Sequence, residues 1–197
     1  MINKKLIMIG GGGHCKSCID VIEEEGQYQI VGILDQEMLV GNEVLGYKII
    51  GTDNEIQKYI DLGYWFLVTV GQTGSPSLRK KLFSLLQKHH AKIATIVSPR
   101  AYVSKYASLG EGTIIMHDVL INVDAAIGVN CIINTKALIE HDAKIESHCH
   151  ISTAAVVNGG IVVKEGTFWG SNTVGKEYTE TRCEEYIKAG ILYKGQL

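Results

Sequence analysis

From residue 97 onward, the hydrophobic positions repeat every six residues. Every sixth residue from Val97 to Trp169 is apolar, without a break. A second series of mostly small residues follows four places after each of them, from Ala101 to Thr173. An α-helix repeats near 3.6 residues and a strand at two, so neither accounts for this period. The period predicts a β-helix in which each hexad supplies one short strand and one corner, with three hexads to a coil.

Before residue 97, strand patterns alternate with helical ones. Apolar runs predict strands at 5–9, 29–35 and 65–70 and a further strand from residue 92. Amphipathic stretches predict helices at 14–25 and 77–89. Such alternation is typical of a parallel sheet of the Rossmann type. The predicted fold class is therefore an α/β, Rossmann-like N-terminal domain followed by a parallel β-helix of hexapeptide repeats.

The same patterns divide the chain into three parts. We expect a Rossmann-like domain that binds a sugar or nucleotide at 1–96, a β-helix at 97–174 and a C-terminal capping tail at 175–197. The tail is charged and does not continue the six-residue series. The Ser/Thr-x-x-Glu pattern from Thr181 to Glu184 indicates a short helix there. The open end of a solenoid needs such a cap.

Composition narrows the class of partner and the compartment. The 197 residues are 46% hydrophobic and 20% charged, with a net charge of −2, so a folded chain without a basic field is expected. We therefore expect neither a nucleic acid nor a membrane as partner. The sequence shows no signal peptide or spanning segment, and five cysteines without an export signal indicate reduced thiols in the cytoplasm.

The glycine run Gly10–Gly13, followed by His14, lies between a predicted strand and a predicted helix. Glycines let the backbone approach a phosphate, and a helix N-terminus offers free N–H groups to an anion. Cys15 stands where the dinucleotide fingerprint needs its third glycine, so NAD is not expected. Asp35 closes the next strand, where a carboxylate can hold a ribose or base edge. A nucleotide site is the favoured interpretation, and a simple tight turn is the alternative.

Among the seven histidines, His141 is the candidate for catalysis. It follows the apolar position 139 by two places, which puts it at the edge of a coil. One coil later, the equivalent residue is Gly159, which leaves room for a ligand beside the imidazole. The neighbouring Glu140 and Asp142 can orient an imidazole that is neutral near pH 7. The alternative is an ordinary surface histidine.

A metal site is a further interpretation of the histidines in the repeat. His148 and His150, with His141 or His117, supply enough ligands for zinc. The spacing differs from that of zinc-binding β-helices such as the γ-class carbonic anhydrases, so no metal is expected.

Two cysteine pairs have a functional and a structural interpretation. Cys15 and Cys18 form a C-x-x-C, which is the pattern of a redox pair or half a zinc site. Cys131 and Cys149 are one coil apart, where a disulfide or two small buried side chains are possible. The structural interpretation is favoured for both pairs.

Several stretches resemble the NeuD/PglD family of sugar acetyltransferases. They occur in the family's order and spacing over about residues 4–174: Gly10–His14 with Lys16-Ser17, VGILD at 31–35, VLGYKIIG at 44–51, Val70-Gly71, AYVS at 101–104 and INTKALIEH at 133–141. The resemblance implies a Rossmann-like domain joined to a left-handed β-helix, with acetyl-CoA as donor and a sialic acid or nucleotide-linked amino sugar as acceptor. The runs at 133–141 and 151–159 are more similar to the sialic acid branch.

The resemblance also implies roles for individual residues. His141 corresponds to the family's catalytic base, which would deprotonate the attacking sugar group in a direct transfer, and Asp142 to its acidic partner. Three residues correspond to positions that contact acetyl-CoA: His150, Gly159 and Ser171. Five correspond to the sugar-nucleotide pocket: Gly12, Gly13, His14, Asp35 and Gly71.

The expected function is thus acetyl-CoA-dependent acetylation of a sugar by a homotrimer, with the CoA site between neighbouring subunits. The alternative is a non-catalytic relative that binds a sugar or nucleotide, or serves in assembly. Family members continue for several more hexads, so an end at residue 174 would favour the alternative.

Overall fold

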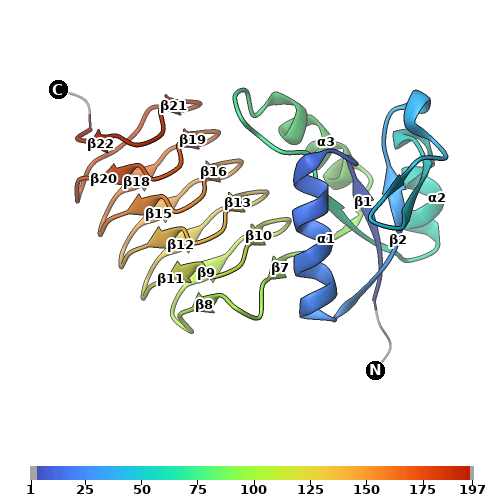
Figure 1. Ribbon diagram of the computed structural model, residues 1–197, viewed down its shortest axis with the longest axis horizontal. Helices are drawn as coiled ribbons and strands as arrows, with labels where there is room; N and C mark the ends of the chain where they lie inside the picture. Colours follow the sequence, from blue (N-terminus) through green and yellow to red (C-terminus); the bar gives the residue numbers. More distant parts are fainter. Residues whose placement is uncertain (1–3, 196–197) are drawn as a thin grey trace.

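The computed structural model describes residues 4–195 and has two domains side by side (Figure 1). The N-terminal domain is built on a six-stranded sheet in the order β3-β4-β2-β1-β5-β6, in which only β3 is antiparallel to its neighbour. A parallel sheet requires crossover connections, and helices supply several of them here. The strands are β1 (Lys4–Ile9), β2 (Tyr28–Leu34), β3 (Glu43–Val44), β4 (Tyr47–Gly51), β5 (Trp65–Val68) and β6 (Lys92–Ile93).

Helices cover both faces of this sheet. Helix α1 (Gly13–Glu25) lies between the sheet and the β-helix, while α2 (Ile56–Asp61) and α3 (Ser77–Lys88) pack on the other face (Figure 1). Two short 3₁₀ helices, η1 (Glu37–Leu39) and η2 (Asp53–Glu55), complete the domain. The predicted strands and helices are present, whereas β3, β4 and α2 were not predicted.

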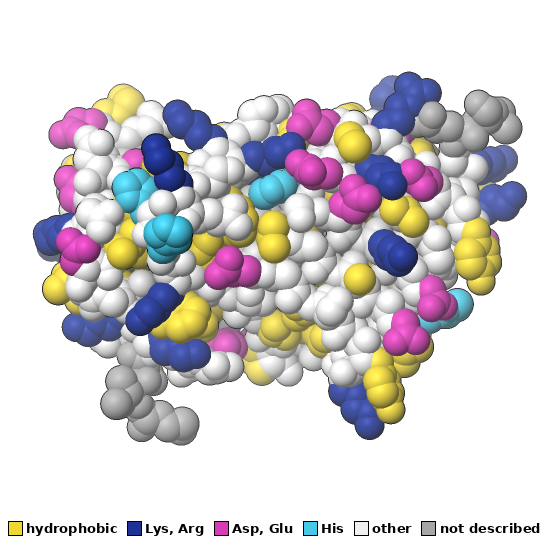
Figure 2. Space-filling view, turned by 180° about the vertical axis from the view of Figure 1, so that it is seen from behind, with side chains coloured by type: hydrophobic (Ala, Val, Ile, Leu, Met, Phe, Trp, Pro, Cys, Tyr) yellow, Lys and Arg dark blue, Asp and Glu magenta, His cyan; other side chains and the backbone are white. Residues whose placement is uncertain are grey.

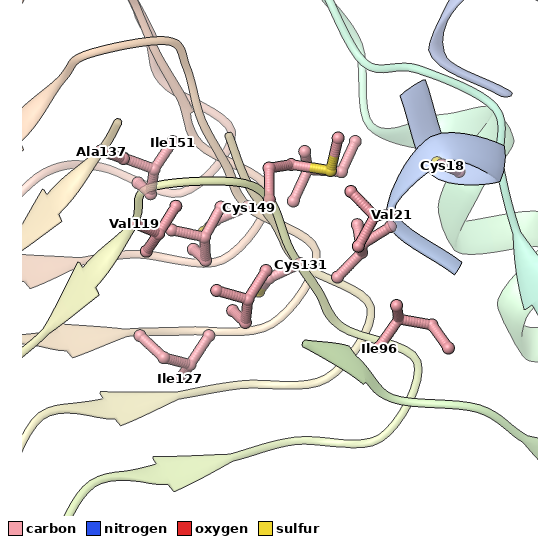
Figure 3. Close-up of a cluster of buried hydrophobic side chains, with 14 of the residues drawn as sticks. Cys18, Val21, Ile96, Val119, Ile127, Cys131, Ala137, Cys149 and Ile151 are labelled. Carbon is pink, nitrogen blue, oxygen red and sulfur yellow. The ribbon is translucent and has the colours of Figure 1, made fainter. Parts of the chain in front are cut away.

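One hydrophobic core is shared by the two domains. It runs from the inner face of the sheet through α1 to the first sheet of the β-helix, and Figure 3 shows Cys18 and Val21 of α1 facing the coils that carry Ile96 and Cys131. All four cysteines of the two pairs are buried free thiols. Burial raises the pKa of the Cys15 thiol to about 11, which disfavours the reactive thiolate. These cysteines are packing residues.

The second domain is a parallel β-helix with three sheets of two-residue strands. Partners are 18 residues apart, as in Ile115 with Ile133 and Ile121 with Ile139. From the strand that ends at Val97 to the strand that ends at Trp169, the second residue of each strand belongs to the predicted apolar series and points inward, and it is buried from Ile115 onward. The fold class predicted from the sequence is confirmed.

The first sheet of the β-helix contains β7 (Ile96–Val97), β10 (Ile114–Ile115), β13 (Ile132–Ile133), β16 (His150–Ile151), β19 (Phe168–Trp169) and β21 (Tyr186–Ile187). The second contains β8 (Tyr102–Val103), β11 (Leu120–Ile121), β14 (Leu138–Ile139), β17 (Val156–Val157), β20 (Val174–Gly175) and β22 (Leu192–Tyr193). The third contains β9 (Ser108–Leu109), β12 (Ala126–Ile127), β15 (Lys144–Ile145) and β18 (Val162–Val163).

The coils continue past residue 174, so the expected end of the repeat there was wrong. β21 pairs with β19, and β22 pairs with β20, which adds another coil. The six-residue series has a glycine, Gly175, in place of an apolar side chain. A Cβ at Gly175 would lie 2.7 Å from the Trp169 ring, so no larger residue fits there. The indole takes the interior volume beside Gly175, and apolar side chains return to the inward positions with Ile187 and Tyr193, both buried. The short helix expected at 181–184 is instead part of a turn.

Acidic and basic side chains are interspersed over the back of the molecule (Figure 2), in keeping with the net charge of −2. Within residues 4–195, none of the helices combines the length and hydrophobicity that crossing a membrane requires.

Candidate active site

His141 lies at the corner between β14 and β15, which joins the second sheet to the third. Its Nδ1 is 2.8 Å from the Asp142 Oδ2, so Nδ1–H donates to the carboxylate and leaves the Nε2 lone pair free. Half of the His141 side chain is exposed. The hydrogen bond to Asp142 raises the pKa of the imidazole. This pairing gives His141 the tautomer and orientation of a general base.

Two further residues shape this corner. The Glu140 carboxylate accepts a hydrogen bond from the Asn122 side chain at 2.8 Å and one from the His141 backbone N–H at 3.3 Å. Glu140 therefore holds the backbone, and Asp142 holds the ring. A Cβ on Gly159 would lie 2.9 Å from the His141 Nε2, so the imidazole lies directly over this glycine.

His150 is far from this corner in the coil, because it is the outward residue of β16 and faces the N-terminal domain. Its Nδ1–H donates to the Gln72 carbonyl, and its Nε2 lies 3.2 Å from the Asn134 Nδ2, which donates to it. Burial lowers its pKa to about 4, so the ring is neutral near pH 7. Ser171 lies at the corner between the first and second sheets, with its hydroxyl 2.9 Å from that of Ser152.

The glycine loop lies at the carboxyl end of β1 and opens α1. A Cβ on Gly12 or Gly13 would meet no atom within 4 Å, so both face open space that a phosphate can enter. A Cβ on Gly71 would lie 3.3 Å from the Cβ of His14, which packs the two segments together. Burial lowers the pKa of His14 to about 3, so it too is neutral.

Beside this loop, a pocket of about 270 Å³ lies at the carboxyl ends of β1 and β2. This is where open α/β sheets bind ligands. Asp35 lines it, with its carboxylate oxygens bound to the backbone N–H groups of Gly11 and Gln36. Thr52, Asp53 and Asn54 also line it, and sequence reasoning missed them because β4 was not recognised.

A buried arginine, also missed, joins the two domains. Arg79 of α3 donates to the carbonyls of Val68 and Val70 at the end of β5 and, at 2.8 Å, to the Asn130 side chain of the β-helix. It thereby fixes the segment that leads to Gln72, the partner of His150. Nothing in its sequence neighbourhood distinguishes it from an exposed arginine of an amphipathic helix.

The predicted site residues therefore form two groups within one chain. His141, Asp142 and Gly159 share the corner between the second and third sheets. His150, Ser171 and the glycine loop lie on or near the first sheet, which faces the N-terminal domain. In a three-sided coil, the corner between the second and third sheets is opposite the first sheet. One chain therefore does not bring His141 to its own nucleotide pocket. Among residues 4–195, no cluster of three potential metal ligands is found.

Comparison with known sequences shows what the N-terminal domain and part of the chain are similar to. Residues 5–86 match the PglD N-terminal domain family. The chain is also 34% identical over 115 residues to the UDP-N-acetylbacillosamine N-acetyltransferase of Bacillus subtilis (strain 168). That alignment covers 57% of this chain and 51% of the relative, so the chain spans about half the length of the curated relative it matches.

Solved structures extend the likeness over both domains. PerB from Caulobacter crescentus, in complex with CoA and GDP-perosamine, is 28% identical, with a TM-score of 0.77 and coverage of 98% of this chain and 94% of PerB. The acetyltransferase domain of PglB from Neisseria gonorrhoeae FA1090 shares the fold at 24% identity, with a TM-score of 0.90 over 99% of this chain and 93% of that domain. The resemblance to the NeuD/PglD sugar acetyltransferases is confirmed.

Proposed function

We propose that the protein transfers an acetyl group from acetyl-CoA to the amino group of a nucleotide-linked amino sugar. The observation that carries this proposal is the corner imidazole, with Nδ1 bound to Asp142 and Nε2 free over Gly159. The relatives named above act on or bind amino sugars, which favours an amine over a sialic acid hydroxyl. The alternative of a non-catalytic relative loses its main support, because the coils do continue past residue 174.

The chain's own groups can carry the transfer. The sugar amine attacks the thioester carbonyl, a C–N bond forms and the C–S bond breaks. His141 Nε2 takes the proton from the attacking nitrogen and passes it to the departing sulfur, so CoA leaves as the thiol. Asp142 stabilises the imidazolium that forms between these steps.

A backbone donor for the carbonyl oxygen lies at the same corner. The Gly160 N–H is already bound to the His141 carbonyl at 3.1 Å. The N–H of Gly159 has no backbone partner within residues 4–195, which makes it the donor available to an oxyanion.

Mass spectrometry tests the proposal directly. The protein is incubated with acetyl-CoA and with UDP- or GDP-linked 4-amino sugars or a sialic acid. We expect an amino sugar to gain one acetyl group with release of one thiol. Binding of a nucleotide sugar without acetyl transfer to any acceptor would instead establish the non-catalytic alternative.

The rate should depend on pH through His141. Only the neutral imidazole accepts a proton, so kcat/KM rises with pH through the pKa of this group. Asp142 raises that pKa, so the inflection should lie above the ordinary value of about 6.5. Asp142→Asn should move the inflection to lower pH and reduce the plateau rate. An unchanged pH profile in Asp142→Asn would contradict the pairing.

A homotrimer is proposed from the surface of the second sheet. Its outward residues form an unbroken apolar row along the coil: Tyr102, Leu120, Leu138, Val156, Val174 and Leu192. The first sheet is covered by the N-terminal domain, and the third presents residues such as Ser108 and Lys144. We expect packing of this row against another copy to bring a His141 corner toward a neighbouring nucleotide pocket, which one chain does not do. In a closed threefold ring, every copy buries its apolar row against a neighbour in the same way.

Subunit complementation tests this arrangement. We expect His141→Ala and Gly12→Asp, which puts a carboxylate at the proposed phosphate site, each to be nearly inactive alone. After mixing, subunit exchange should restore part of the activity, because some sites combine an intact base with an intact pocket. Light scattering should give the mass of a trimer. A monomer of 21.6 kDa, or no restored activity in exchanged trimers, would refute the shared site.

A further inference from the structure

Tyr178 occupies the same place in its coil as Asp142, two coils further on. Residues 124, 142, 160 and 178 follow one another at this corner at intervals of 18, and all four have a positive φ. Gly160 is the only one of the four without a side chain, although aspartate and tyrosine adopt the same backbone conformation there. Backbone geometry therefore does not explain the glycine at 160.

The neighbouring side chains do explain it. A Cβ on Gly160 would lie 2.4 Å from the Tyr178 Cδ1 and 2.5 Å from its Cε1, so one edge of the phenol ring lies against this glycine. The His141 ring lies on the adjacent Gly159 from the coil on the other side. Two rings thus contact one glycine pair, His141 from the coil before it and Tyr178 from the coil after it.

Beyond Tyr178 the surface opens into a hollow of about 700 Å³. Tyr178 lines it together with Thr179, Lys194 and Gly195, while His141 and Gly159 do not. The phenol ring therefore lies between Gly160, which it contacts, and this larger space. Tyr178 is 77% exposed, so the protein keeps a large aromatic residue at a place where packing of the core does not require it.

We propose that Tyr178 determines acyl-chain specificity, by closing the acyl pocket behind the acetyl group of the donor. This inference rests on the proposed acetyl transfer. The thioester carbonyl must lie within reach of a nucleophile that is itself hydrogen-bonded to Nε2, which places the acyl group above Gly159, next to the glycine that the ring contacts. A butyryl chain has two more methylenes, and the ring occupies the space they need.

The experiment compares kcat/KM for butyryl-CoA and acetyl-CoA in wild-type protein and variants. One methylene in a pocket changes selectivity by about 10–200-fold, so Tyr178→Ala should raise the butyryl-to-acetyl ratio by at least about tenfold. Tyr178→Phe keeps the ring and should keep the wild-type ratio. Gly160→Ala should act like Tyr178→Ala, because its Cβ displaces the ring, and Ala154 shows that alanine adopts a positive φ in this coil.

Tyr106→Ala is the matched control. Tyr106 belongs to the same corner and is 64% exposed, but it lies four coils, or about 19 Å, from Tyr178. Its removal should leave the ratio unchanged. Wild-type selectivity in folded Tyr178→Ala would overturn the inference while leaving acetyl transfer intact. Absence of transfer from any donor by the wild-type protein would overturn the proposed function itself.

Discussion

Replacement of His141 by alanine is expected to lower kcat by about 10²–10⁴, the usual contribution of a general base. Among residues 4–195, no other imidazole lies at this corner, since His150 faces the N-terminal domain and both its nitrogens are hydrogen-bonded. Half of the His141 side chain is exposed, so its loss removes little buried surface. Thermal unfolding should therefore be close to that of the wild-type protein.

Steady-state kinetics with acetyl-CoA and the acceptor identified by mass spectrometry check this expectation. Imidazole added to the buffer should restore part of the rate, because the cavity left over Gly159 is open to solvent. The nucleotide pocket is on the other side of the coil, so the affinity of the protein for the nucleotide sugar, measured by calorimetry, should not change. Retention of more than about a tenth of the wild-type kcat would contradict a general-base role.

The β-helix could be predicted from the sequence because its rule is local and repeats. Each inward position from Val97 to Trp169 is filled by an apolar side chain, and the structure buries those that have coils on both sides. The same rule failed at Gly175. An inward position needs a large apolar side chain only where the interior is not already filled by a neighbouring residue. That volume is taken there by the Trp169 indole, from six residues earlier. A larger neighbour thus removed the signal without ending the coil.

The corner site was predictable for the same reason. A spacing of 18 residues stacks Gly159 on His141, and the structure places the imidazole over that glycine. The convergence of Tyr178 on the same pair follows from the identical rule applied once more. The sequence alone does not reveal it, because Gly175 interrupts the apolar series before Tyr178.

The contacts between the domains could not be predicted in this way. His150 binds the carbonyl of Gln72, and Arg79 binds Asn130, across sequence separations of 78 and 51 residues. Both depend on how the Rossmann-like sheet docks on the first sheet of the β-helix, which no periodic pattern encodes. The hairpin of β3 and β4 was missed because its strands are short and the pocket residues after it lack a distinctive motif.

Gly159→Val is expected to reduce acetyl transfer by about 100-fold or more while leaving nucleotide-sugar binding intact. A Cβ at this position would lie 2.8 Å from the His141 Cε1, so the valine must displace the imidazole. A displacement of about 1 Å at a reacting group already costs about 10² in rate. The valine also fills the space proposed for the thioester, so the affinity for acetyl-CoA should fall as well.

The fold itself should tolerate this change. Gly159 does not have a positive φ. Val123 occupies the same place in its coil two coils earlier, so a valine is compatible with this position of the repeat. Glu177→Val, one coil further on, controls for the effect of a valine at this corner on Tm. Calorimetry should show that the Gly159→Val variant no longer binds CoA but still binds the nucleotide sugar. Equal losses for both ligands, or a Tm far below that of Glu177→Val, would mean that Gly159 serves the coil and not the acetyl group.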